Sequence, residues 1–301
     1  MLRQNETSIW SSEMKRVFQL LFVGVAVLSW AGQAQASVLV GVTGDGAIDS
    51  ESLYFLSQTD ASSTFIMRLG NGRDGETIGF NPVDGLLYHA SGISPGDRFW
   101  ESINVGTTTI VTSGQFTGPA VVNENLAMTY NSATGTFLVA NRDQNVFYDA
   151  TLAGVATDIG TTPEDLKGLA FIGSTLYGAS AFSDTLYELD PTDGSVVSSL
   201  AVTLDGGSIR GMNGLATDPD TGLLWGIFRL SSGGRLLGTL DPTTGTGTSV
   251  GILSDNFAGI AFLGSTAAVP EPSTFALLGI GAIGMAFGAV RNLRTTKNTV
   301  S

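Results

Sequence analysis

The feature that most constrains the fold is a pattern that recurs along the body of the chain. Each copy begins with a strand of small residues and continues through a tight turn. A second strand follows, which ends in an aromatic or aliphatic residue. The copies start near residues 77, 126, 168, 214 and 259, a period of about 40–50 residues. Such self-similarity indicates a fold built from repeated units that stack on one another.

Two kinds of turn mark the repeats. The first begins with Asn or Asp and ends with Gly, as in residues 81–85, 131–135 and 218–222. The second has the form Asp-Pro-Thr-x-Gly, at residues 190–194 and 241–245. Asn and Asp open such turns by hydrogen bonding to the nearby backbone, and Gly accepts a positive φ. Each full repeat therefore contains four short strands, which is typical of a β-propeller blade.

The sequence predicts an all-β, five-bladed propeller over residues 37–268. The last repeat start, residues 259–262, has no further strands before Pro270. Residues 39–44, 52–56 and 64–69 match the missing strands, so we expect one blade to be built from both ends of the domain. That closure removes the open sheet edges. A β-sandwich and a six-bladed ring with one unrecognised copy are the alternatives.

The repeats resemble those of loosely related exported propellers with the blade pattern G-[LI]-A-x…G-x-L-[YW]-[GA]…L-[YF]-x-[LI]-D-P-x-[TD]-G. The resemblance covers most of residues 38–263. These motifs specify strands and turns. They imply no particular activity, because propellers include hydrolases, lectins, oxidoreductases and scaffolds.

The N-terminal segment, residues 1–36, reads as a signal peptide. Lys15 and Arg16 precede a mostly apolar run over residues 17–30, and Ala34-Gln35-Ala36 is a small-x-small cleavage site. Cleavage after Ala36 would leave Ser37 at the mature N-terminus. Met14 is a candidate for the true start, because a basic pair follows it directly. The alternative is an uncleaved N-terminal membrane anchor.

The body is strongly acidic. Residues 37–269 contain 24 Asp and Glu against 8 Lys and Arg, a balance near −16. We therefore expect no nonspecific binding to nucleic acid, whose phosphates require Lys and Arg. The chain has no cysteine, which excludes disulfides and thiolate metal sites.

Nucleophilic catalysis has little support in this sequence. His89 is the only histidine, and its position in a predicted strand favours a structural role with a hydrogen bond. The sequence contains neither the phosphate-binding motif GxxxxGK[ST] nor a GxGxxG motif that follows a predicted strand. Trp100 and Trp225 are candidate sugar-binding platforms, but we expect both in the core.

Acidic and amide residues next to the inner strands are the remaining candidates for chemistry. We expect them to surround one mouth of the central channel. They are Glu76, Glu124, Asp165, Asn213 and Asn256, with Asp74, Glu164 and Asp255 beside them. The favoured interpretation is structural, in solvated loops and Asx turns. Binding of carbohydrate or of a cation such as Ca²⁺, the one cofactor that we consider, is the second. Acid–base catalysis by a pair such as Glu124 and Asp165 is the third.

The C-terminal segment, residues 269–301, reads as a sorting signal. Residues 274–290 contain no charge, and as a helix they would span about 25 Å, enough for a short transmembrane segment. Arg291, Arg294 and Lys297 follow, and they predict a membrane stop with the C-terminus in the cytoplasm.

This tail closely resembles the PEP-CTERM sorting signal of Gram-negative, exopolysaccharide-producing bacteria. The matching residues are Val269, Pro270, Glu271 and Pro272, the apolar run, and the basic end with Arg291 and Arg294. The resemblance implies recognition by an exosortase, a membrane protease, with processing near residues 270–272. It also implies a precursor tethered transiently in the inner membrane, then delivery to the cell surface or extracellular matrix.

Together these features predict an exported, non-enzymatic binding or scaffold protein, with polysaccharide as the candidate ligand and the biofilm matrix as its setting. A carbohydrate-active hydrolase that uses the carboxylates of the channel mouth is the alternative.

Overall fold

The computed structural model describes residues 36–69, 75–92, 97–118, 124–142 and 144–264. The predicted signal peptide, the sorting motif, the apolar span and its basic stop lie outside these residues, apart from Ala36. In the described part of the chain, all regular secondary structure is β-strand. That part contains no helix long and apolar enough to cross a membrane.

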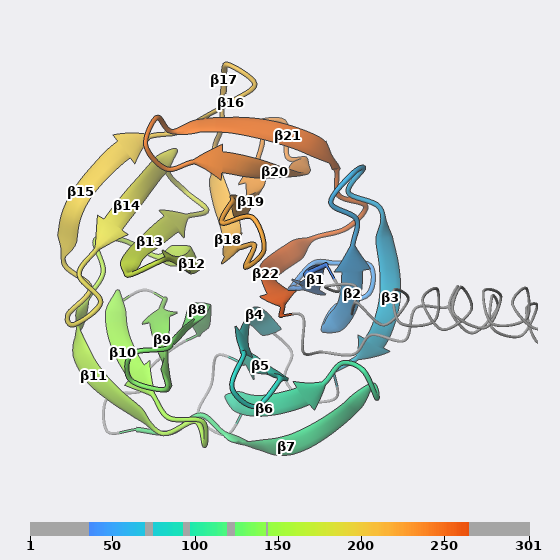
Figure 1. Ribbon diagram of the computed structural model, residues 1–301, viewed down its shortest axis with the longest axis vertical. Coiled ribbons are helices and arrows are strands. Elements are labelled where there is room, and N and C mark those ends of the chain that lie inside the picture. The colour runs from blue at the N-terminus through green and yellow to red at the C-terminus, as the bar shows by residue number, and fades with distance from the viewer. Residues whose placement is uncertain (1–35, 70–74, 93–96, 119–123, 143, 265–301) are drawn as a thin grey trace, which may run out of the picture. The chain divides into compact units, whose positions relative to one another are not determined.

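The strands form five sheets around a common centre (Figure 1). We number these blades in chain order and give their strands from the centre outwards. Blade 1 consists of β22 (Phe257–Leu263), β1 (Val38–Thr43), β2 (Ser52–Leu56) and β3 (Ser63–Arg68). Blade 2 consists of β4 (Gly75–Asn81), β5 (Leu86–Ser91), β6 (Phe99–Asn104) and β7 (Thr109–Gln115).

The other three blades follow the same order. Blade 3 consists of β8 (Asn125–Asn131), β9 (Thr136–Asn141), β10 (Val146–Ala150) and β11 (Ala156–Thr161). Blade 4 consists of β12 (Leu166–Ile172), β13 (Thr175–Ser180), β14 (Thr185–Leu189) and β15 (Val196–Ala201). Blade 5 consists of β18 (Gly211–Thr217), β19 (Leu224–Arg229), β20 (Arg235–Asp241) and β21 (Thr246–Ile252). A hairpin of β16 (Thr203–Leu204) and β17 (Gly207–Ser208) extends blade 5, with β16 parallel to β21.

The inner strands β4, β8, β12, β18 and β22 contact one another in this order, and β22 contacts β4 again. The sheets therefore close into a ring, as Figure 1 shows. This arrangement confirms the predicted five-bladed propeller and rules out the sandwich and the six-bladed ring.

Blade 1 is built from both ends of the domain, as predicted. The last strand, β22, pairs antiparallel with the first strand, β1, from Val38 opposite Leu263 to Thr43 opposite Phe257. β2 and β3 then complete the sheet. Hydrogen bonds between β1 and β22 thus hold the ring closed.

The turns have the local chemistry that the sequence predicts. In the turn after β18, the Asp218 carboxylate accepts the backbone N–H of Asp220 at 3.0 Å and the hydroxyl of Thr221 at 2.7 Å. Gly222 ends this turn with a φ of +73°. A side chain other than Gly would be strained at that angle.

Each inner strand carries a β-bulge near its start. In β18, for example, Asn213 pairs with Ile227 and Leu215 pairs with Gly226, so Gly214 has no partner in the register. The unpaired residues of the other inner strands are Glu76, Leu126, Lys167 and Ala258, and the Gly214 bulge lies one position later in its repeat than these four. A bulge increases the local twist of a strand, so the same bend recurs at every blade.

Small residues allow the inner strands to approach one another. A Cβ atom on Gly168 would lie 2.7 Å from the backbone nitrogen of Leu215 in the next blade. A Cβ atom on Gly214 would lie 3.0 Å from the backbone nitrogen of Ile260. The first distance is shorter than real Cβ contacts and the second is tighter than nearly all of them, so a side chain at either position would press against the next inner strand.

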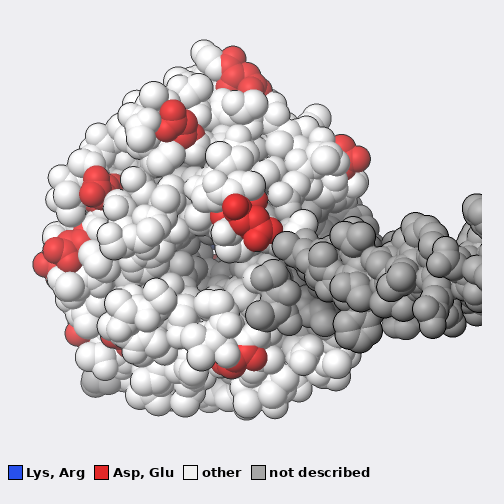
Figure 2. Space-filling model, viewed as in Figure 1, with Lys and Arg blue, Asp and Glu red and all other residues white. Residues whose placement is uncertain are grey.

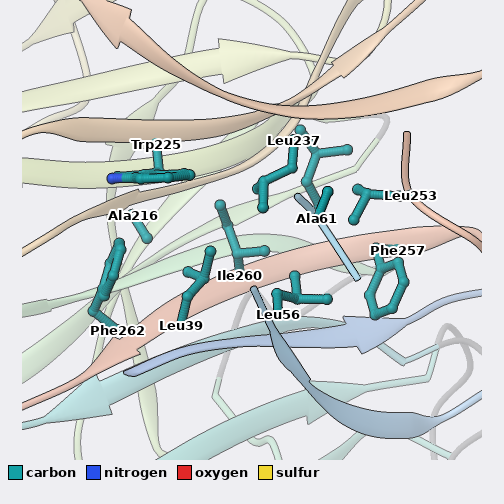
Figure 3. Close-up of a cluster of buried hydrophobic side chains, with 11 residues drawn as sticks. Leu39, Leu56, Ala61, Ala216, Trp225, Leu237, Leu253, Phe257, Ile260 and Phe262 are labelled. Carbon is teal, nitrogen blue, oxygen red and sulfur yellow. The ribbon is translucent and has the colours of Figure 1, made fainter. Parts of the chain in front are cut away.

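Hydrophobic side chains fill the spaces between neighbouring blades. Figure 3 shows the cluster between blade 5 and blade 1, where Ile260 lies among Trp225, Leu39 and Leu56. The rings of Trp225 and Phe262 meet edge to face, with their centroids 6.1 Å apart. Trp225 is 5% exposed and Trp100 is 2% exposed, so both tryptophans belong to the core as predicted.

Candidate functional site

The central channel has two mouths that differ in chemistry. The inner strands start at one of them, which we call the N-side mouth. They end at the other, the C-side mouth, where the turns after β4, β8 and β18 lie. The residues singled out from the sequence belong to the N-side mouth.

Glu124 is the residue before β8, and its side chain is 3% exposed. One of its carboxylate oxygens accepts a hydrogen bond from the guanidinium of Arg142 at 2.9 Å. The backbone carbonyl of Glu124 also accepts the N–H of Arg142 at 2.8 Å. Glu124 is therefore paired within blade 3 by a residue at the end of its neighbouring strand.

Glu164 is bound in a similar way within blade 4. One of its oxygens accepts hydrogen bonds from the hydroxyls of Tyr187 at 2.6 Å and Ser183 at 2.5 Å. Burial raises the pKa of Tyr187, and its hydrogen bond to Glu164 raises it further. The phenol therefore stays protonated and acts as a donor. Asp165 follows Glu164 and is half-buried before β12.

The remaining candidates are held in different ways. Asn213 lies inside β18 rather than before it, is 3% exposed, and has a side-chain oxygen without a hydrogen-bond partner among the described residues. The side-chain amide of Asn256 donates to the backbone carbonyl of Asp45 in blade 1. Glu76 is the bulge residue of β4, and its side chain lies outside the described part of the structure.

Of these residues, Glu124, Glu164 and Asn256 form hydrogen bonds that hold neighbouring loops and strands of the ring. In the described part of the chain, no three or more His, Asp or Glu residues form a group that could hold a metal ion. The cation interpretation gains no support from this geometry.

His89 lies in β5 at the interface of blades 1 and 2, where its side chain is completely buried. Its Nδ1 is 3.4 Å from one oxygen of Glu101, and the hydroxyl of Ser113 donates to the other oxygen at 3.0 Å. In a catalytic triad the serine contacts the histidine, not the carboxylate. This row of three side chains is therefore a structural network across the sheet.

The C-side mouth contains a cavity of about 380 Å³ that sequence reasoning missed. All five inner strands contribute to it. The lining comprises Ile78, Gly79, Phe80, Pro82, Met128, Thr129, Tyr130, Ser132, Leu169, Ala170, Phe171, Leu215, Ala216, Thr217, Pro219, Ile260, Ala261, Phe262 and Gly264. None of these residues carries a charge.

The same position of each inner strand supplies the most distinctive part of this lining. Four strands place an aromatic residue there, namely Phe80, Tyr130, Phe171 and Phe262, and β18 places Thr217. The signal was visible in the sequence, because each repeat has an apolar residue and then an aromatic one two residues later, except at Thr217.

A polar spot interrupts the aromatic lining beside blade 5. The hydroxyl of Thr217 and the indole N–H of Trp225 are buried without hydrogen-bond partners among the described residues. Trp225 packs against Ala216 and Phe262, which both line the cavity, and Figure 3 shows its nitrogen on their side of the ring. The cavity lining thus combines aromatic surfaces with the Thr217 hydroxyl, and the indole of Trp225 packs directly behind two lining residues.

Negative charge is distributed around the ring, and some of it lies beside the central hollow (Figure 2), although the cavity lining itself has no charged residue. Figure 2 shows Asp and Glu at intervals on one face, which is hollowed at its centre, and no Lys or Arg among the described atoms in that view. An acidic surface of this kind disfavours anionic ligands. A neutral ligand meets no such barrier at the uncharged cavity.

Comparison with known proteins identifies the C-terminal sorting signal. Residues 268–292 match the family model of the PEP-CTERM protein-sorting motif, so the chain carries this sorting signal, and it includes Val269, Pro270, Glu271, Pro272 and Arg291. The motif implies an exported protein that is sorted by an exosortase in a Gram-negative bacterium. A search among curated proteins finds no match.

Several solved structures are similar in shape but distant in sequence. A protein of unknown function from Bacteroides caccae has 11% identity and a TM-score of 0.48, over 76% of this chain and 99% of that chain. The glutaminyl cyclase of Myxococcus xanthus has 16% identity and a TM-score of 0.42, over 66% and 76%. A putative 6-phosphogluconolactonase from Bacteroides uniformis has 13% identity and a TM-score of 0.42, over 73% and 83%.

Proposed function

We propose that the propeller is a non-catalytic binding module that holds neutral sugar units of an extracellular polysaccharide in its C-side cavity. The lining of that cavity carries this proposal, because it combines aromatic rings and hydroxyls with no charged side chain. Aromatic faces pack against the apolar C–H faces of sugar rings, and a few polar groups fix the orientation of the ligand.

The dimensions of the cavity support a ligand of this size. Its volume of about 380 Å³ lies within the range of about 300–1,000 Å³ that small-molecule sites have. Phe80, Tyr130 and Phe171 are only half-buried, so their rings offer surface to a ligand. The unpartnered hydroxyl of Thr217, which lines the cavity, would gain a hydrogen bond when a sugar hydroxyl reaches it.

The placement of the carboxylates supports binding without hydrolysis. A glycoside hydrolase needs two carboxyl groups on either side of the bond that it cleaves. The cavity lining contains no carboxylate, whereas Glu124 and Glu164 belong to the opposite mouth and are hydrogen-bonded within their own blades.

The export and sorting signals support a role in the cell envelope or matrix. In this proposal the signal peptide directs export, and the span at residues 274–290 tethers the precursor in the inner membrane. The exosortase then cleaves near residues 270–272 and releases the propeller to the cell surface or the biofilm matrix. There it would bind or cross-connect exopolysaccharide as a scaffold component.

Binding and hydrolysis are tested on the exported protein with neutral oligosaccharides from the host's own exopolysaccharide. We expect saturable binding without release of reducing ends. Phe171→Ala should weaken binding at least about tenfold, since loss of one good aromatic contact costs roughly 1.4 kcal/mol or more. Phe182→Ala is the matched control, because Phe182 is an exposed aromatic outside the cavity.

Two results would overturn the proposal. One is equal binding by the wild type and the Phe171→Ala variant, with near-UV circular dichroism showing both folded. The other is glycan cleavage that the Glu124→Gln substitution abolishes, which would establish the hydrolase alternative.

A further inference from the structure

Ser37 lies in a polar site between blade 1 and blade 5. Its backbone N–H donates to a carboxylate oxygen of Asp220 at 2.6 Å, and its hydroxyl donates to Asp218 at 2.5 Å. Its carbonyl accepts the side-chain amide of Gln58 at 3.1 Å. Ser37 is 5% exposed, while Ala36 before it is exposed. Ser37 is therefore the first residue that the folded domain holds.

The two aspartates of this site come from the turn after β18. Asp218 is 4% exposed, whereas Asp220 is exposed at the rim. Burial would raise the pKa of Asp218, but hydrogen bonds from Ser37 and Thr221 and from the N–H groups of Asp220 and Thr221 lower it overall. Asp218 is therefore a carboxylate at neutral pH.

The site contains negative charge without a visible counter-ion. Within the described residues, no ion pair includes Asp218 or Asp220. An ammonium group at the position of the Ser37 nitrogen would supply the opposite charge at hydrogen-bond distance. Charge-assisted hydrogen bonds of this kind are short and roughly twice as strong as neutral ones.

The predicted export signal ends at the same position. Ala34-Gln35-Ala36 forms the small-x-small cleavage site, and the compact unit of the folded chain begins at Ser37. The sequence and the structure thus mark one peptide bond independently.

We propose that the Ala36–Ser37 bond is the processing site of the precursor, and that Asp218 and Asp220 bind the α-ammonium group which the cleavage creates. A signal peptidase hydrolyses the bond with one water molecule. The carbonyl carbon of Ala36 gains the oxygen and leaves as a carboxylate, and the nitrogen of Ser37 is protonated. The positive charge then joins β1 to blade 5, beside the seam where the ring closes.

The consequence is a closure that depends on export. Blade 1 is held by the pairing of β1 with β22, and Ser37 directly precedes β1. Pro219, between the two aspartates, also lines the C-side cavity. The ammonium group therefore fixes both the first strand of the ring and one part of the cavity rim.

The test uses the full chain, exported from a Gram-negative host that has a signal peptidase. N-terminal sequencing should find Ser37 at the start of the mature protein. The purified protein is then treated at pH 7 with an amine-acylating reagent, and the rate at the α-amine is followed by peptide mass spectrometry. Acylation requires the neutral amine, and each unit by which nearby carboxylates raise its pKa lowers the neutral fraction tenfold.

We expect the Asp220→Asn variant to be acylated at the α-amine about tenfold faster than the wild type. Asp241→Asn is the matched control. Asp241 accepts the same kind of turn hydrogen bonds from Thr243 and Thr244 but does not contact Ser37. Asp220 is exposed, so its variant should remain folded, and Asp218→Asn provides a second measurement on the buried partner.

A mature N-terminus at any other residue would overturn the proposal. Equal acylation rates in the wild type, Asp220→Asn and Asp241→Asn proteins would overturn it as well, because the α-amine would then be free of the two carboxylates.

Discussion

Individual aspartates determine the turns of this propeller through hydrogen bonds to the backbone two residues ahead. Asp190 and Asp241 each accept the N–H and the hydroxyl of the Thr two positions later. Asp60 makes the equivalent pair of bonds with Ser62. These bonds stabilise the charged form, so the pKa values of all three aspartates are lowered. The negative charge of the body is therefore partly a by-product of turn formation.

Acid should weaken these turns, and Asp60→Asn tests this at one site. Hydrogen bonds from Ser57 and then Ser62 lower the pKa of Asp60 to about 2, compared with about 3.9 in an unfolded chain. A lowered pKa stabilises the fold above the unfolded value, and the stabilisation is lost as the pH falls through the folded value.

The Asp60→Asn variant should therefore have a slightly lower Tm than the wild type at pH 6, and the difference should shrink as the pH falls from 4 to 2. Thermal unfolding at a series of pH values measures this. A Tm difference that stays constant down to pH 2 would contradict the assignment.

The repeated element is an inner strand with a bulge at its start and small residues at its crowded points. Gly214 combines the two features, because it is the unpaired bulge residue and lies close to the next inner strand. It also has a φ of +60°. The bulges and the close approaches occur where neighbouring blades meet at the axis. They give each blade the same bend, which a closed ring of similar blades requires.

Three Gly→Ala substitutions separate the backbone angle from the crowding. Gly85 has a φ of +73° with nothing within 4 Å of the added Cβ, so Gly85→Ala should cost about 1–2 kcal/mol. At Gly168 the added Cβ would be 2.7 Å from a backbone nitrogen at an ordinary φ, so Gly168→Ala should cost about 1–3 kcal/mol.

Gly214 combines both effects, and Gly214→Ala should cost about 2–5 kcal/mol. Denaturant unfolding of the three variants gives the free energies. If Gly85→Ala destabilised the protein as much as Gly214→Ala, crowding at the axis would have no measurable role.

The order of elements could be predicted from sequence because turn chemistry is local. Asp218 and Gly222 lie in one turn, and their residue types alone indicate its geometry. The bulges could not be predicted, since they depend on the register between two strands. The hydrogen-bond partners of the candidate carboxylates could not be predicted either. Glu164, for example, accepts a hydrogen bond from Tyr187, which lies 23 residues later in the chain.

The cavity could not be predicted from the sequence because its lining comes from five separate segments. Phe80, Tyr130, Phe171 and Phe262 each pack in a hydrophobic cluster between two neighbouring blades, which is an ordinary core role. Only closure of the ring brings the four residues together. The recurring aromatic residue is visible in the sequence, but no single repeat shows that its copies line one cavity.

At the scale of the whole molecule, the sorting signal follows closely on the strand that closes the ring in blade 1. β22 ends at Leu263, and the sorting motif begins at residue 268, so only a few residues separate the closing strand from the signal. The pairing of β22 with β1 involves only residues 38–43 and 257–263. We therefore expect the ring to keep its last strand when the exosortase removes the tail.

Replacing Pro270, Glu271 and Pro272 together by Ala should prevent processing by the exosortase. We expect several-fold less protein in the extracellular fraction and accumulation of the uncleaved form in the inner membrane, measured by fractionation and immunoblotting. Asn298→Ala combined with Thr299→Ala is the control, because these residues follow the basic stop. Normal release of the triple variant would show that the motif does not determine sorting.

The fluorescence of Trp225 tests most directly whether the C-side cavity binds sugar. Removal of residues 1–36 leaves Trp100 and Trp225 as the two tryptophans of the chain. The Trp100→Phe variant therefore reports on Trp225 alone, which packs against two residues of the cavity wall. On titration with neutral oligosaccharides of the exopolysaccharide, we predict a saturable change in Trp225 emission and an intact glycan afterwards. Unchanged emission at a concentration that saturates binding, or release of shorter sugars, would contradict the proposed function.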